Sequence, residues 1–101
     1  MRSVSVADLK SVLEAAEAVV IDVREPWEYA EGHVPGARLA PLATVPTLVG
    51  DLPTDVPVYL VCAVGGRSGQ AAVYLSQHGV DAVNVDGGTQ EWVAAGFPVQ
   101  T

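Results

Sequence analysis

The stretch VYLVCAVGGRSGQAAVYL, from Val58 to Leu75, determines the class of fold that the sequence predicts. Its first four residues are apolar without alternation, which is typical of a β-strand buried on both faces. A glycine-rich segment, Cys62–Ser68, follows, and from Ser68 onward a helix is expected that ends at Gly79. A buried strand, a glycine-rich loop and a helix in succession indicate an α/β protein with a parallel sheet.

The rest of the chain repeats this alternation of strand and helix, with no linker or internal repeat. Short apolar runs at 19–21 and 82–85 predict two more buried strands. The other expected helices cover residues 6–16, 26–30, 41–49 and 90–95. Ser5 and Asp8 suit a capping box for the first of these, and Thr89 is the expected N-cap of the last. We therefore expect a single domain over residues 1–101, with a mostly parallel sheet and helices on both faces.

Composition and charge restrict the classes of function. Half of the 101 residues are apolar and 17% are charged, which argues against disorder. The net charge is −7 and the five Lys and Arg residues do not cluster, so neither nucleic acid nor a membrane is an expected partner. The lone Cys62 cannot form an internal disulfide, and with His33 and His78 it has no metal-ligand spacing, so no metal or other cofactor is expected. Without a leader or a transmembrane run, the expected location is the cytoplasm.

The expected architecture also locates a site. In open parallel sheets, ligands bind beyond the carboxyl ends of the strands. Three segments are expected to leave that edge of the sheet, at residues 22–25, 62–68 and 86–88.

The segment at 62–68 has the composition of an anion-binding loop. Gly65 and Gly66 permit backbone angles that turn successive N–H groups inward, and the following helix adds the positive end of its dipole. A cysteine at the rim of such a loop is expected to ionise readily, and the thiolate is the reactive form. Arg67 is always charged and can hold an oxyanion through two parallel hydrogen bonds.

Each of these features also has a purely structural interpretation. A lone cysteine is often a small buried hydrophobe, a glycine pair often marks a turn, and Ser68 suits a helix N-cap. Their occurrence together, within seven residues at a strand end, favours function.

Three segments resemble signatures of the rhodanese, or sulfurtransferase, family. Cys62-x-x-Gly65-x-Arg67-Ser68 is similar to the family's active-site loop. IDVREPWEYAEGHVPGA, from 21 to 37, resembles its N-terminal signature, and VNVDGGTQEWVAAGFPV, from 83 to 99, resembles its C-terminal one. The resemblance covers almost the whole chain and implies a single rhodanese-like domain with a five-stranded, mainly parallel sheet.

The resemblance also implies a mechanism. The Cys62 thiolate would attack the outer sulfur of a donor such as thiosulfate, release sulfite, and pass the resulting persulfide sulfur to cyanide or a thiol. Arg67 would hold the loop and the anionic end of the donor. The residues whose backbone N–H groups would stabilise the persulfide are Ala63, Val64, Gly65, Gly66 and Ser68. A protein that accepts the sulfur is a further expected kind of partner.

Residues of the N-terminal signature are expected to support the site. Asp22 and Arg24 resemble the family's Asp-x-Arg element; a structural role is expected for Asp22, while Arg24 either binds an anion or pairs with Asp22 or Glu25. His33 is expected to hydrogen-bond the backbone of the turn at 32–36. The expected packing residues are Trp27, Tyr29 and Trp92, and the expected solvated residues are Glu25, Glu28 and Glu31.

Other functions remain open from the sequence. A sulfur carrier would share the first half-reaction, and some rhodanese-like domains are binding modules without catalysis. Phosphatases of related fold place five residues between cysteine and arginine, whereas four lie between Cys62 and Arg67, and arsenate reduction by a thiol relay needs a second cysteine. Ala63 and Val64 are uncharged, which predicts weak attraction for the thiosulfate dianion.

Overall fold

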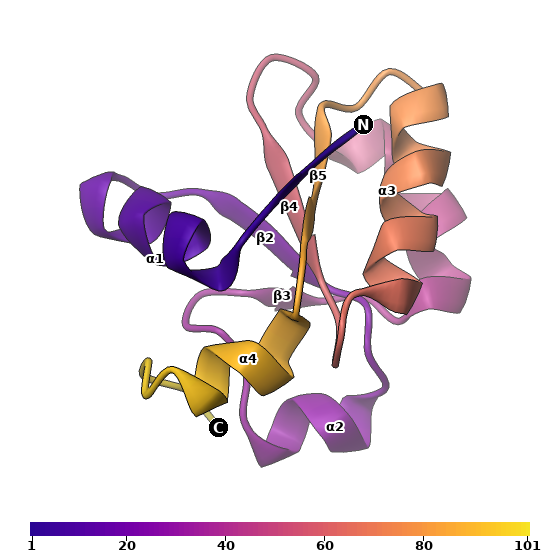
Figure 1. Cartoon of the computed structure of the whole chain (residues 1–101). Coiled ribbons are helices and arrows are strands. Elements are labelled where there is room, and N and C mark those ends of the chain that lie inside the picture. Colours follow the sequence, from indigo (N-terminus) through magenta and orange to yellow (C-terminus); the bar gives the residue numbers. More distant parts are fainter.

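The computed structural model describes residues 1–101 and contains one sheet of five strands, in which every neighbouring pair is parallel (Figure 1). The strands are β1 (Arg2–Val4), β2 (Val19–Asp22), β3 (Arg38–Leu39), β4 (Val58–Val61) and β5 (Ala82–Val85), in the order β1-β5-β4-β2-β3. The helices are α1 (Val6–Ala15), α2 (Pro26–Glu31), α3 (Gly66–Gln77) and α4 (Gly88–Ala94), with a 3-10 helix η1 (Leu42–Asp51). The predicted α/β class and the five-stranded sheet are confirmed.

The two edge strands have no counterpart among the apolar runs. β1 pairs with β5 from Arg2 opposite Val83 to Val4 opposite Val85, and its own residues are exposed or half-buried. β3 is only two residues long and also lies at an edge. Short, half-exposed strands lack the continuous apolar signal that marks β2, β4 and β5.

The sheet has a separate apolar core on each face. Successive side chains of a strand point to opposite faces. In β4, Val58 and Leu60 therefore pack on the face covered by α3 and η1, whereas Tyr59 and Val61 pack on the face covered by α1 and α4. Figure 1 shows α3 on one side of the sheet and α1 and α4 on the other, with α2 at the edge where β2 and β4 end. This two-sided burial explains the apolar run of β4.

The helix starts differ in part from the prediction. The capping box is confirmed, because the Ser5 hydroxyl accepts from the Asp8 N–H at 3.1 Å and the Asp8 carboxylate accepts from the Ser5 N–H at 3.2 Å. However, α3 begins at Gly66 rather than Ser68, and α4 begins at Gly88 rather than after Thr89. In both cases a glycine with positive φ precedes the helix, and this conformation lets the chain turn directly from the loop into the first helical turn.

The expected helix at 41–49 is the 3-10 helix η1, which contains Pro46. Proline lacks the N–H that an α-helical interior requires. No helix in the structure has the length and apolar composition needed to cross a bilayer.

Candidate active site

Cys62 follows directly after β4, at the carboxyl edge of the sheet. Asp22, the last residue of β2, lies opposite Val61 in the parallel register, and the Val23 N–H donates to the Val61 carbonyl at 2.9 Å. The segments that leave β2 and β4 therefore begin side by side. This arrangement places the expected loop where ligands bind in open parallel sheets.

The first residues of α4 hold the Cys62 loop, which comprises residues 62–68. The N–H groups of Thr89 and Gln90 donate to the carbonyls of Cys62 and Ala63 at 2.9 and 3.0 Å, and the Thr89 hydroxyl donates to the Cys62 carbonyl at 3.1 Å. Gly88 has a φ of +56°, and a Cβ atom there would lie 2.5 Å from the Cys62 carbonyl oxygen. The prediction that the glycine pair at 87–88 lies at the same edge is confirmed, and Thr89 binds the loop instead of capping α4.

The sulfur of Cys62 lies at the floor of the loop. Its Sγ accepts a hydrogen bond from the Gly65 N–H at 3.1 Å and lies 3.3 Å from the Ser68 hydroxyl. The residue is only 1% exposed and packs with the core beneath α3. The expected position at the rim is therefore wrong. Cys62 continues the alternation of β4 and points to the same face as Leu60, beneath α3.

The surroundings of Cys62 favour its thiolate. Burial opposes ionisation of the thiol, but hydrogen bonds from the Ser68 hydroxyl and from the N–H groups of Ser68, Gly65 and Val64 outweigh it, so the pKa of Cys62 lies below its ordinary value. A lowered pKa raises the fraction of nucleophilic sulfur at neutral pH. The loop therefore combines a buried sulfur with main-chain donors that stabilise its charge.

Arg67 binds a carboxylate of α2. Its two terminal nitrogens donate to the Glu28 carboxylate at 2.7 and 2.9 Å. The Glu28 side chain is 13% exposed, so the expectation that it belongs to a solvated face is wrong. The hydrogen bonds from Arg67, together with one from the Glu25 N–H, outweigh burial and lower the pKa of Glu28 to about 2, while the pKa of Arg67 is raised.

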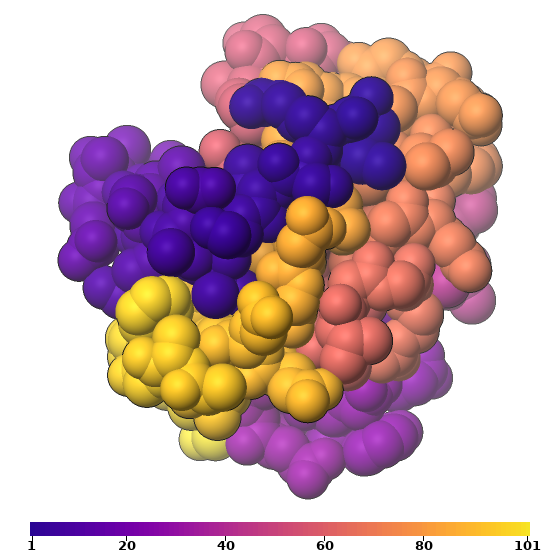
Figure 2. All heavy atoms as spheres, viewed as in Figure 1, coloured from indigo at the N-terminus to yellow at the C-terminus, as the bar shows by residue number.

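No local signal distinguished Glu28 from its neighbours Glu25 and Glu31, because its partner is 39 residues away in the chain. The start of α3 and the α2 segment adjoin in the space-filling view of Figure 2, with the start of α4 on the other side. The Glu28–Arg67 pair thus anchors the end of the Cys62 loop to α2.

Asp22 and Arg24 form a buried ion pair. The Arg24 side chain donates to the Asp22 carboxylate at 2.9 to 3.1 Å and to the Gly32 carbonyl at 2.9 Å. Asp22 is fully buried and Arg24 is 6% exposed. Of the alternatives open for Arg24, the structure shows the pair with Asp22.

A polar network that the sequence analysis missed lies behind the sulfur. The Ser68 hydroxyl lies 2.6 Å from Oδ1 of Asn84 on β5, and Asn84 Nδ2 donates to the Gly65 carbonyl at 3.3 Å and to the Asp86 carboxylate at 3.2 Å. Asn84 is 7% exposed. The one feature of the sequence that could have identified Asn84 is that it is a polar residue inside an apolar strand.

Two of the other expectations for the N-terminal signature are wrong. His33 was expected to hydrogen-bond the backbone of the turn at 32–36. Instead, its Nδ1 lies 2.9 Å from the carbonyl oxygen of Tyr29 in α2, and its ring stacks on the Tyr29 ring. Trp27 is 68% exposed, so it does not pack in a core. By contrast, Trp92 is buried as expected and donates to the Pro98 carbonyl at 2.7 Å.

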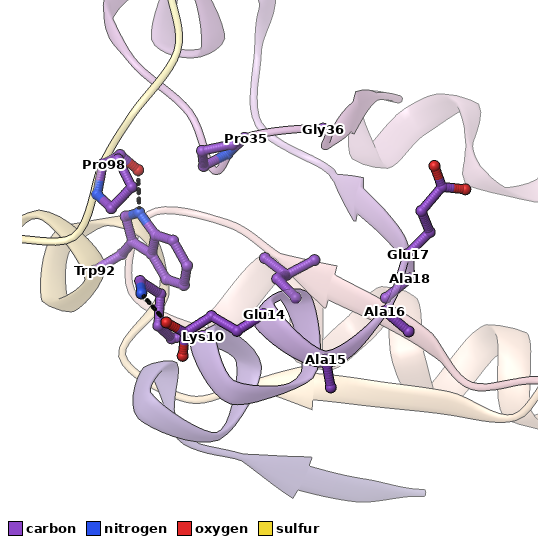
Figure 3. A pocket seen from close by; sticks show the side chains of 11 residues that line it. Lys10, Glu14, Ala15, Ala16, Glu17, Ala18, Pro35, Gly36, Trp92 and Pro98 are labelled. Atoms are coloured by element: carbon purple, nitrogen blue, oxygen red, sulfur yellow. Dashed lines mark hydrogen bonds and ion pairs between the residues drawn. The ribbon is translucent and has the colours of Figure 1, made fainter.

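A hollow of about 710 Å³ lies elsewhere, between the end of α1, the turn at Pro35–Gly36 and Trp92 (Figure 3). It contains the Lys10–Glu14 ion pair, at 3.0 Å. None of the Cys62 loop residues lines it, so it is separate from the candidate site.

Comparison with known proteins agrees with this geometry. Residues 5–95 match the sequence model of the Rhodanese-like domain family. A protein of Allochromatium vinosum named "Sulfurtransferase" is 34% identical over 87 residues, which cover 85% of this chain and 81% of that protein.

Solved structures of similar sequence share the whole fold. A rhodanese-related protein from Thermoplasma volcanium is 36% identical, with a TM-score of 0.91 over 99% of this chain and 98% of its own. A rhodanese-like domain protein from Staphylococcus aureus is also 36% identical, with a TM-score of 0.88 over the full length of both chains. The family match, the sequence relatives and the shared fold together show that this chain belongs to the rhodanese-like domain family.

Proposed function

We propose that the protein is a sulfurtransferase that carries sulfane sulfur as a persulfide on Cys62. The observation that carries the proposal is the lowered pKa of the Cys62 thiol beneath a ring of main-chain N–H donors. An ionised sulfur at the carboxyl edge of the sheet is a nucleophile, and the same donors suit the anionic terminal sulfur of a persulfide.

The reaction has two half-reactions. The Cys62 thiolate forms a bond to the outer sulfur of the donor, and the donor's own bond to that sulfur breaks; with thiosulfate, sulfite leaves with the electron pair. A thiolate or cyanide acceptor then attacks the terminal sulfur of the persulfide, and the Cys62 thiolate is the leaving group. Because this chain holds no second cysteine to displace the sulfur, an external acceptor takes it, and ping-pong kinetics are expected.

The charges around the loop predict weak binding of thiosulfate. Arg67 is paired with Glu28 and Arg24 with Asp22, so each cation near the site is balanced by a carboxylate. Ala63 and Val64 add no charge, and the chain carries a net charge of −7. A dianion gains little attraction from such a site, so the Michaelis constant for thiosulfate is expected to be high.

Two further functions compete with catalytic turnover. A sulfur carrier would form the same persulfide and pass it only to a specific protein acceptor, and a binding module would form none. Persulfide formation separates the module from the other two, and turnover with cyanide or a small thiol separates the enzyme from the carrier. Phosphatase activity is disfavoured by the four-residue spacing between Cys62 and Arg67, and an assay with a generic aryl phosphate tests it.

Mass spectrometry of the intact protein tests the proposal. After incubation with thiosulfate or a polysulfide, we expect a gain of one sulfur atom, about 32 Da, that is absent in Cys62→Ser. Cys62 is almost completely buried, so the access of reagents to its sulfur has to be measured separately. We expect iodoacetamide to label native Cys62 at neutral pH. A protein that is labelled only after unfolding, and that gains no sulfur from either donor, would refute persulfide chemistry.

A further inference from the structure

We propose that Asn84 is a positioning residue that competes with the Cys62 thiolate for the single proton of the Ser68 hydroxyl. Ser68 lies in the first turn of α3 with no solvent exposure, and its oxygen is 2.6 Å from Asn84 Oδ1 and 3.3 Å from Cys62 Sγ. A hydroxyl has one proton and donates to only one of these two acceptors at a time.

The orientation of Asn84 is determined by its other partners. Its Nδ2 lies between the Gly65 carbonyl, at 3.3 Å, and the Asp86 carboxylate, at 3.2 Å, both of which accept hydrogen bonds. If the side-chain amide were flipped, Oδ1 would face these two acceptors and would accept no hydrogen bond. Oδ1 therefore points to Ser68, and Asn84 offers Ser68 an acceptor and not a donor.

The position of the Ser68 proton then depends on the charge of the sulfur. With a neutral thiol, the S–H donates to the Ser68 oxygen while the Ser68 proton remains on the side of Asn84, and every group is satisfied. With a thiolate, the proton turns to Sγ and leaves buried Oδ1 of Asn84 without a donor, which costs free energy. Asn84 thus weakens the stabilisation that Ser68 gives to the thiolate.

The other charged groups near the sulfur are paired or exposed. Arg67 on α3 is held by Glu28 on α2, Asp22 at the end of β2 pairs with Arg24, and Asp86 follows β5. Asp86 is exposed, and the Gly65 carbonyl also accepts from the Gly69 N–H at 3.0 Å. Replacement of Asn84 by an apolar residue therefore leaves neither acceptor of its Nδ2 group buried and unpaired, and the Ser68 hydroxyl can still donate to Sγ.

The test is a pH titration of Cys62 in the absence of any sulfur donor. The ultraviolet absorbance of the thiolate monitors the titration, and Cys62→Ser supplies the baseline. Asn84→Leu removes the competing acceptor, so we expect its thiolate to form at lower pH than in the wild type. Ser68→Ala removes the donor, so we expect the opposite shift. At a fixed pH within the transition, each variant should change the ratio of thiolate to thiol about tenfold, because hydrogen bonds to charged groups are strong.

The double variant Ser68→Ala/Asn84→Leu distinguishes competition from a general disturbance of the loop. Without the hydroxyl, Asn84→Leu should no longer shift the titration. Asn84→Val is a second apolar variant if Asn84→Leu does not fold. An unchanged or raised titration midpoint in the folded apolar variant, or an equal effect of Asn84→Leu with and without Ser68, would overturn the proposal.

A consequence for sulfur transfer rests on the proposed function. In the persulfide the negative charge resides on the terminal sulfur, so Sγ no longer needs the Ser68 proton, which returns to Asn84. Asn84 should therefore favour the loaded state. At a fixed ratio of thiosulfate to sulfite, we expect the persulfide fraction measured by mass spectrometry to fall several-fold in Asn84→Leu. Failure to load in all variants would count against sulfur transfer alone, because the titration needs no sulfur donor.

Discussion

The carboxylate of Glu28 accepts two hydrogen bonds from the guanidinium of Arg67, at 2.7 and 2.9 Å, and so joins α2 to the end of the Cys62 loop. The Arg67 side chain remains 36% exposed, which leaves it within reach of an anion, but Glu28 balances its charge. Arg67 thus anchors the loop, and in the proposed reaction its attraction for an anionic donor would depend on Glu28.

Glu28→Gln should improve the reaction with thiosulfate. The glutamine amide still accepts a hydrogen bond from Arg67 but no longer neutralises it, so the site gains a net positive charge. We expect the apparent KM for thiosulfate in persulfide formation to fall at least about threefold, because a unit charge near the site attracts a dianion even in a high dielectric. A sulfur donor without net charge should show little change.

Arg67→Ala is the matched counterpart. It leaves the Glu28 carboxylate alone beside the loop, so we expect donor turnover to decrease by far more than stability does. The double variant Glu28→Gln/Arg67→Ala should recover part of the loss. Unchanged turnover in Arg67→Ala would show that Arg67 takes no part in donor binding.

The contribution of Glu28 to stability should depend on pH. The pKa of Glu28 is lowered from 4.5 to about 2 in the folded protein, so its pairing stabilises the fold fully above about 4.5 and loses this effect as the pH falls towards 2. Urea unfolding should show that Glu28→Gln is less stable than the wild type by about 1 kcal/mol near neutral pH, since the pair is partly exposed. The difference should vanish towards pH 2, and a constant difference across this range would contradict the assignment.

Gly88→Ala should disturb the Cys62 loop. Gly88 has a φ of +56°, and its added Cβ would approach the carbonyls of Cys62 and Ala63 at 2.5 and 2.7 Å. Gly96→Ala is the control, because Gly96 has a φ of +78° but no atom within 4 Å of such a Cβ. We expect Gly96→Ala to cost about 1 kcal/mol of unfolding free energy and Gly88→Ala about 2 kcal/mol or more, with reduced persulfide formation only in Gly88→Ala. Equal losses in the two variants would show that close packing of α4 on the loop is unimportant.

Asp22→Asn should lower stability more than any exposed ion-pair variant. It leaves the Arg24 guanidinium buried with a neutral partner, and loss of one member of a buried pair costs about 3 kcal/mol. Asp81→Asn makes the same change in the exposed pair with Arg2 and should cost less than about 0.5 kcal/mol. Urea unfolding measures both. A small effect of Asp22→Asn would show that Arg24 finds another partner or water.

The helix starts show how far local sequence reasoning extends. The capping box of Ser5 and Asp8 was predictable because both partners lie within one turn of the helix. The starts of α3 and α4 were each misplaced by two residues, because Ser68 and Thr89 resemble N-caps but their hydroxyls contact Asn84 and Cys62 instead. Those contacts exist only once the loops after β4 and β5 lie together.

The chain by itself determined the α/β class, the three central strands and the placement of Cys62 in a glycine-rich loop, since these depend on apolar runs and spacing between near neighbours. Only the tertiary structure decided which polar groups meet at the loop: Glu28 with Arg67, Asn84 with Ser68, and Gly88 against the Cys62 carbonyl. It also decided that the sulfur lies beneath α3 and not at the rim. The physical reason is that hydrogen bonding and burial depend on separation in space, and the parallel sheet brings together strand ends that are far apart in sequence.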